Sequence, residues 1–432
     1  MSSNRIPDFI RRYSVLIALF WLALAVVTNV FVPQLETVAE QHNVSLSPQD
    51  APSLQASKQI GKVFQEFDSD SSAMIVLEGD QPLGAEAHRY YDDLVAKLSA
   101  DTTHVQHIDN FWGDPLTAAG SQSSDGKAAL VQLYLAGNQG ESLANESVDA
   151  VRDIVADSPP PEGLRVYVTG AAPLVTDQFE VGRHGTLKTT IITLLVIAVM
   201  LFWLYRRLTT VFLVIFTVMI ELTASRGVVA VLANAGIIEL STYSTNLLTL
   251  LVIAAGTDYA IFLLGRFHEA LYAGQDRVQA FNTMYHGTAH IILGSGLTIA
   301  GAVLCLTFTR LPYFESLGIP AGTGVLVAVV AALTLAPALL CIGRHFGLFE
   351  PVRQLQTQGW RRIGTAIVRW PGPILVVTGA IALIGVFALP GFEVSYDNRP
   401  YIPASAPGVV GMEAAGMGDE MRDCHGISLK CR

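Results

Sequence analysis

An aspartate inside a long apolar run is the residue of this sequence best placed to do chemistry. Asp258 lies within the hydrophobic stretch 245–266, with Tyr259 beside it. The stretch is long enough to cross a bilayer as a helix, which takes about 20 apolar residues. Because a charged side chain at the centre of such a helix costs about 3 kcal/mol to insert, we expect the helix to turn Asp258 toward a bundle interior.

The chemistry that this pair suggests is proton transfer. A carboxyl group can bind and release a proton, and a neighbouring tyrosine hydroxyl can donate or accept a hydrogen bond. We therefore interpret Asp258 and Tyr259 as a proton relay. Two other interpretations also fit the sequence: an aspartate that caps the backbone of a neighbouring helix, and a polar spot that faces a substrate.

A second acidic residue lies in another apolar run. Glu221 is near the middle of the stretch 210–235, and we predict a secondary relay position there, facing Asp258 across the bundle; a structural role fits equally well. Arg226 follows five residues later, about 140° around a helix, so the two side chains need different partners. Arg226 is nearer the outer surface, and we expect its charged end to reach the interface.

The relay candidates belong to a pattern of seven apolar runs. These runs cover residues 14–32, 189–205, 210–235, 245–266, 289–308, 317–342 and 373–389. Basic residues flank them on one side only, which by the positive-inside rule places the N-terminus and the loops at Arg206, Arg266 and Arg353 in the cytoplasm. The pattern predicts a multi-pass protein of the plasma (inner) membrane, with residues 34–188 outside.

Composition supports a membrane protein with one sizeable water-exposed part. Of 432 residues, 51% are hydrophobic and only 15% are charged, and the mean hydropathy is +0.43. The net charge is −10, so the sequence lacks the excess of basic residues that is typical of nucleic-acid-binding proteins. We therefore expect no nucleic-acid partner. Four cysteines occur, none of them between residues 34 and 188, so we expect no disulfide framework in that segment.

Signals for bound metals, cofactors or enzymatic chemistry are weak. His104 and His107 have no third ligand nearby, so we expect no metal site. The sequence carries no Walker A motif, no Gly-x-Ser-x-Gly and no dinucleotide-binding fingerprint. We therefore expect a protein that is not an enzyme, holds no cofactor and would draw its energy from a proton gradient.

The polar segment 34–188 has an order of periodicities typical of an α+β fold. Strands are predicted at 73–77, 105–111, 129–135 and 165–168, and helical stripes lie between the first and second and between the third and fourth. This is the split βαβ, ferredoxin-like order. Another set of apolar residues at helical spacing predicts a helix ahead of the first strand. These residues are Ile60, Val63, Phe64 and Phe67.

These observations define the expected organisation: an α-helical membrane bundle of seven transmembrane helices with an inserted α+β ferredoxin-like extracytoplasmic domain. The expected parts are 1–33 (N-terminus and first span), 34–188 (extracytoplasmic domain), 189–343 (spans two to six), 344–372 (a basic amphipathic cytoplasmic helix with Trp360 and Trp370 at the interface), 373–390 (seventh span) and 391–432 (the start of a second outer domain). Residues 267–282 are expected to form a separate polar helix. A strand is expected at 392–396. The tail from Gly418 is polar and aperiodic, and we interpret it as sequence that does not belong with the rest of the chain.

The chain up to about Gly416 resembles the MmpL family of mycobacterial lipid transporters, in the resistance-nodulation-division (RND) superfamily. The likeness is carried by LLTLLVIAAGTDYAIFLLGRFHEA (247–270), TMYHGTAHIILGSGLTIAGA (283–302), LPYFESLGIP (311–320), RRIGTAIVRWPGP (361–373) and SLSPQDAPS (45–53). The resemblance implies export of lipids or lipid-like siderophores, driven by the proton-motive force. It also implies an accessory partner of the MmpS type, and the intramembrane Asp-Tyr pair of the family matches Asp258 and Tyr259.

The chain departs from this family pattern in one respect. Family members carry a second Asp-Tyr pair in a second half, which this sequence does not contain. We therefore expect an incomplete half that does not transport alone and that needs a second-half polypeptide as partner. Two alternatives remain open: a non-transporting lipid-sensing or partner-binding protein, since 189–343 also resembles the sterol-sensing bundle of Patched-like proteins, and an inert truncation product.

Overall fold

The structure is a computed structural model that describes residues 5–41, 43–345, 358–389 and 402–415. The chain divides into two compact units, residues 1–349 with 399–432, and residues 350–398. The predicted strand at 392–396, Arg353 and the tail from Gly418 lie outside the described residues.

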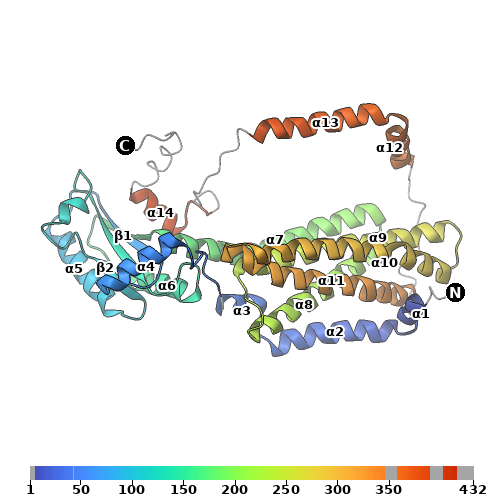
Figure 1. The fold of residues 1–432 in the computed structure, drawn as a ribbon, viewed down its shortest axis with the longest axis horizontal. Helices are drawn as coiled ribbons and strands as arrows, with labels where there is room; N and C mark the ends of the chain where they lie inside the picture. Colours follow the sequence, from blue (N-terminus) through green and yellow to red (C-terminus); the bar gives the residue numbers. More distant parts are fainter. Residues whose placement is uncertain (1–4, 42, 346–357, 390–401, 416–432) are drawn as a thin grey trace. The chain divides into compact units, whose positions relative to one another are not determined.

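Helices dominate the described chain (Figure 1). They are α1 Arg5–Arg12, α2 Ser14–Phe31, α3 Leu35–Gln41, α4 Pro52–Phe64, α5 Ala85–Ala100, η1 Ala118–Gly120, α6 Ser142–Ala156, α7 Ala171–Tyr205, α8 Leu208–Asn234, α9 Thr242–Tyr272, α10 Arg277–Leu304, η2 Cys305–Phe308, α11 Pro312–His345, α12 Gln358–Arg369, α13 Pro371–Ala388 and α14 Pro407–Ala414.

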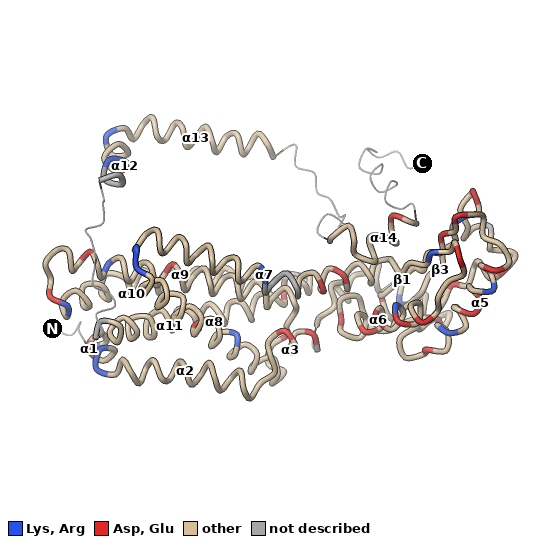
Figure 2. Tube along the Cα trace, turned by 180° about the vertical axis from the view of Figure 1, so that it is seen from behind, with Lys and Arg blue, Asp and Glu red and all other residues tan. Residues whose placement is uncertain are grey.

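Among the described residues, seven helical segments are long and apolar enough to cross a membrane, which confirms the number predicted from the sequence. They are Ser14–Phe31, Lys188–Tyr205, Leu208–Asn234, Thr242–Tyr272, Arg277–Phe308, Pro312–Gly343 and Pro371–Ala388. Figure 2 shows these helices with few charged positions along their length, whereas acidic and basic positions are frequent around the sheet. Lys188–Tyr205 is the end of a longer helix, α7, which begins directly after the last strand.

The fourth and fifth spans are longer than predicted, and the separate polar helix expected at 267–282 is wrong. Helix α9 continues to Tyr272, and α10 begins at Arg277. The turn between them contains Gly274 at φ +84°, a left-handed conformation that favours glycine. Asp276 then caps α10 by accepting hydrogen bonds from the backbone N–H groups of Val278 and Gln279, at 2.7 and 2.9 Å.

A four-stranded antiparallel sheet forms the non-membranous core. Its strands are β1 Ser72–Gly79, β2 Val105–Asp109, β3 Ala128–Leu135 and β4 Leu164–Thr169, in the spatial order β2-β3-β1-β4. All four predicted strands are confirmed, as are helices α5 and α6 between them. In β3 every second residue is buried, so alternate side chains enter the core. We call residues 72–169 the sheet region.

The helix predicted from the apolar stripe near residue 60 exists as α4, but its stripe does not join the core. Ile60, Val63 and Phe64 are 56, 64 and 68% exposed. Phe67, the fourth predicted member, lies beyond the end of the helix and stacks on Tyr134 with ring centroids 3.9 Å apart. An amphipathic pattern therefore identified the helix but not the surface that covers it.

Helix α14, near the end of the described chain, docks on the sheet region and on α7. The backbone N–H of Gly408 donates to Asp177 Oδ2 at 2.8 Å, and the Thr169 hydroxyl donates to the Gly408 carbonyl. Asp177 is 2% exposed and also accepts a hydrogen bond from Arg152 at 2.6 Å. A glycine is required at position 408 because α14 and α7 approach closely there: a Cβ at this position would lie 2.7 Å from Asp177 Oδ2.

Within residues 350–398 the structure describes α12 and α13. The basic helix expected at 344–372 is represented by α12, which ends at Arg369; residues 346–357 lie outside the described chain. Pro371 occupies the first turn of α13, where its missing N–H has no helical partner to lose. Trp370, between the two helices, is 58% exposed.

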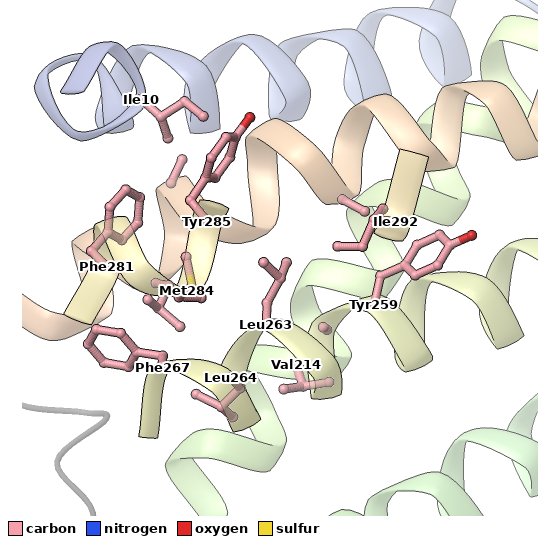
Figure 3. Packing of buried hydrophobic residues seen from close by; sticks show 14 of the residues in the cluster. Ile10, Val214, Tyr259, Leu263, Leu264, Phe267, Phe281, Met284, Tyr285 and Ile292 are labelled. Carbon is pink, nitrogen blue, oxygen red and sulfur yellow. The ribbon is translucent and has the colours of Figure 1, made fainter. Parts of the chain in front are cut away.

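The bundle of α2 and α7–α11 is held by apolar packing and by small residues at close crossings. Figure 3 shows part of its largest core, in which Phe267 of α9 faces Phe281 and Met284 of α10. Gly296 of α10 is required by its neighbour, because a Cβ there would overlap the side chain of Val329 on α11. This agrees with the rule that small residues let membrane helices approach.

Candidate functional site

The two members of the predicted relay lie on different faces of α9. Consecutive helical residues point about 100° apart. Tyr259 is buried, and it accepts a hydrogen bond from the Ser295 hydroxyl of α10 at 3.3 Å. Figure 3 places its ring beside Ile292 of α10. The tyrosine is therefore fixed by contacts within this chain.

Asp258, in contrast, lies on the exposed surface of the bundle. Leu250, Ala254 and Asp258 follow one another at four-residue intervals and are all exposed, so they form one open stripe along α9. The stripe is apolar except for the aspartate. No described helix of residues 5–345 covers Asp258, so this part of the chain does not by itself form the bundle interior that the sequence predicts around it. A carboxylate on such a face can exchange protons only if a further element or water surrounds it.

Glu221 of α8 is buried, and it does not meet Asp258. Its side chain is 1% exposed and lies against Gly256 of α9, where a Cβ would be 2.8 Å from Glu221 Oε2. Gly256 and Asp258 are two residues apart, so they point about 200° apart on the helix. Glu221 and Asp258 therefore do not face each other across the bundle, contrary to the prediction from the sequence.

Arg226, five residues after Glu221, has partners that the sequence did not indicate. Its guanidinium forms an ion pair with Glu36 of α3 and donates to the Thr249 hydroxyl of α9 at 2.9 Å. Neither partner of Arg226 is shared with Glu221, which makes no hydrogen bond or ion pair with a described residue. Glu36 could not be chosen in advance, because it precedes Arg226 by 190 residues and belongs to a short polar helix.

This ion pair lines a large cavity with a volume of about 910 Å³. The cavity is bounded by α3, the start of α6, the upstream part of α7, and α8 and α9, so it lies where the membrane helices meet the segment that leads to the sheet region. Its wall includes five acidic residues and one arginine: Glu36, Glu40, Glu146, Asp149, Glu180 and Arg226. Phe179, Met219 and Leu222 give it an apolar side. The lining is therefore amphipathic.

Comparison with known proteins agrees with this arrangement. Residues 45–374 match the profile of the MMPL family. The chain is 58% identical over 411 residues to "Probable transport protein MmpL2" of Mycobacterium tuberculosis, and 56% identical over 410 residues to "Probable transport protein MmpL4" of Mycobacterium leprae. It is 56% identical over 411 residues to "Siderophore exporter MmpL5" of Mycobacterium tuberculosis.

These alignments cover 95% of this chain but only 42 to 43% of the length of those relatives. The matched region includes α4, the whole sheet region and the helices α7 to α11, which carry Tyr259, Asp258, Glu221 and part of the cavity lining. The profile match covers most of the chain. On this ground the chain, a multi-pass membrane protein, belongs to the MMPL family of the RND superfamily.

Proposed function

We propose that this chain forms one half of a proton-driven exporter of lipids or lipid-like siderophores in the plasma (inner) membrane. One observation carries the proposal: Asp258 is an ionisable residue on an otherwise apolar, uncovered stripe of a bilayer-length helix. Such a residue is stable in a membrane only where another helix or water surrounds it. Ionisable residues in membrane helices typically take part in the movement of ions or protons. Tyr259, fixed by Ser295, supplies a hydroxyl next to it.

The half-transporter proposal is supported by the open face around Asp258. Transporters of this general kind work by rocking one half against another around a shared path. The chain spans less than half the length of the relatives with the highest identity quoted above, and one of those relatives is named a siderophore exporter. A second half that packs on Leu250, Ala254 and Asp258 would enclose the carboxyl group. We accordingly propose that the chain alone does not transport.

We further propose that the sheet region is a ferredoxin-like extracytoplasmic domain, within the expected domain 34–188. The strand order β2-β3-β1-β4, with α5 and α6 as crossovers, supports this interpretation. A local repeat supports a second such domain. The motif Pro-x-x-Ala-Pro begins α4 at residues 48–52 and α14 at residues 403–407, and in both helices the alanine is the N-cap and the second proline starts the helix.

The amphipathic cavity is the proposed entry for substrate. A lipid-like molecule has an apolar tail and a polar head, and the cavity offers both kinds of lining beside the membrane helices. We propose that an MmpS-type accessory protein and a second-half polypeptide complete the assembly. No enzymatic step and no bound cofactor are part of this proposal.

The test is reconstitution from two halves. The chain is co-expressed with the part of the MmpL2 relative that extends beyond the matched region, and export of a fluorescent lipid is followed in vesicles with an imposed proton gradient. We expect export from the pair, its loss with a protonophore, and none from the chain alone. Export by the chain alone would contradict the half-transporter proposal. A stable pair that binds lipid without exporting it would favour the lipid-sensing alternative instead.

A further inference from the structure

Three buried polar residues of α8 and α9 have no role in the function proposed above. Glu221 Oε1, Ser225 Oγ and Thr257 Oγ1 are all buried, and none of them makes a hydrogen bond with any described residue. Their side chains are 1, 0 and 5% exposed. Three unsatisfied oxygen atoms are unusual, because buried polar groups in folded proteins almost always have partners.

These three residues come from two helices that touch. Glu221 and Ser225 are four residues apart, so they lie on one face of α8. Thr257 follows Gly256, the residue of α9 against which the Glu221 carboxyl group lies. Because Gly256 has no side chain, the carboxyl group fits directly against the α9 backbone. The close crossing of α8 and α9 therefore creates a small polar site in an apolar bundle.

Among the described side chains, no opposite charge pairs with Glu221 to keep it ionised. The described helices packed against α8 are α2, α3, α7, α9 and α11. Helix α2 has no ionisable residue, and α11 has only Cys341 between residues 316 and 343. The ionisable residues with described side chains on the other three are Glu36 and Glu40 on α3; Asp177, Glu180, Lys188 and Tyr205 on α7; and Tyr243, Asp258, Tyr259, Arg266, His268, Glu269 and Tyr272 on α9. None of them forms a hydrogen bond or ion pair with Glu221.

On its own helix, Arg226 is the nearest cation in sequence, and Glu36 already neutralises it. An ionised carboxylate without a partner is far more costly to bury than a neutral carboxylic acid.

We propose that Glu221 is a proton-binding site, separate from Asp258, that holds its proton in the packed bundle and shares it in a hydrogen bond with Ser225 or Thr257. A neutral carboxylic acid is both a donor and an acceptor, and each hydroxyl can be either, so a protonated Glu221 is chemically able to pair with either hydroxyl group. The site depends only on α8 and α9. It therefore exists in this chain whether or not the proposed transport function is correct.

Infrared spectroscopy of the purified 432-residue chain, with isotope-labelled glutamate and at neutral pH, tests this inference. A protonated carboxyl group has a carbonyl stretch distinct from the carboxylate bands, and the label separates glutamate from aspartate and lipid. We expect one such glutamate band. It should vanish in Glu221→Gln, and it should persist in Asp258→Asn and in the matched control Glu239→Gln, whose glutamate is exposed near the end of α8. Ser225→Ala or Thr257→Ala should shift its frequency.

A chain without a protonated glutamate band, or a band that Glu221→Gln leaves unchanged, would overturn the proposal. If Glu221→Gln does not fold, Gly256→Ala provides the second measurement. Its added methyl group would press on the carboxyl group at 2.8 Å, so the band should shift in this variant. An unshifted band in folded Gly256→Ala would contradict the assignment to Glu221. None of these readouts requires transport, so a failure of the proposed exporter function would leave the result interpretable.

Discussion

The carboxyl group of Glu221 on α8 lies against Gly256 on α9, so closely that a Cβ atom at residue 256 would be 2.8 Å from Oε2. Two residues further along α9, Asp258 points to the opposite, uncovered side. Glu221 and Asp258 thus occupy separate environments. Glu221 is enclosed by the packed helices of this chain, whereas Asp258 is exposed.

Helix packing in the bundle predicts different effects for two neighbouring glycines of α10. Gly296→Ala should destabilise the chain by about 1–3 kcal/mol, because its Cβ would overlap Val329. Gly294→Ala is the matched control: nothing lies within 4 Å of its Cβ, so the better helix propensity of alanine should leave stability unchanged or raise it by up to about 1 kcal/mol. Thermal unfolding in detergent measures both, and equal effects would contradict the close crossing.

The ion pair between Arg226 and Glu36 should fix α3 against the bundle. A double-mutant cycle with Arg226→Gln and Glu36→Gln is expected to give a coupling energy of about 1 kcal/mol or more, since both side chains are partly buried. The exposed pair Arg266–Glu269, at 2.7 Å and three residues apart, is the control, with an expected coupling of at most about 0.5 kcal/mol. Equal couplings would show that α3 is not held by Arg226.

The sheet region should lose stability in alkaline solution through Tyr91. Burial, helped by the negative charge of Asp92, raises the pKa of Tyr91 to about 12 from its ordinary value of 10, although backbone hydrogen bonds partly oppose this. The unfolded state therefore releases its proton first, so the stabilisation is complete below pH 10 and is lost between about pH 10 and 12. Tyr91→Phe should flatten this decline. An unchanged profile in denaturant titrations would argue against a buried, neutral Tyr91.

The membrane orientation remains a prediction from the arginine distribution. In a background without native cysteines, a cysteine at Ser121 should react with an impermeant reagent in intact cells, whereas one at Gln275, in the turn between α9 and α10, should react only after permeabilisation. The opposite pattern would invert the orientation of the whole bundle.

The seven spans and the four strands could be predicted because each has a local signal, a long apolar run or an alternation of apolar residues. The end of α9 could not, because Phe267 and His268 are buried by packing against other helices rather than by lipid. The partner of Arg226 and the lining of the cavity come from segments far apart in sequence. The exposed stripe of α4 marks a third limit: Ile60 and Phe64 predicted burial that the described chain does not provide.

The central claim is that Asp258 carries the protons of an exporter to which this chain contributes one half. The most direct measurement is proton uptake into liposomes that contain the two halves, followed with an enclosed pH-sensitive dye. Asp258→Asn should abolish the uptake while assembly is retained, since asparagine keeps the shape but cannot accept a proton. In pairs of halves that still assemble, Leu250→Asn, which places the same amide on the same exposed stripe, should leave the uptake unchanged. Proton uptake by Asp258→Asn at the rate of the unsubstituted chain would contradict the claim.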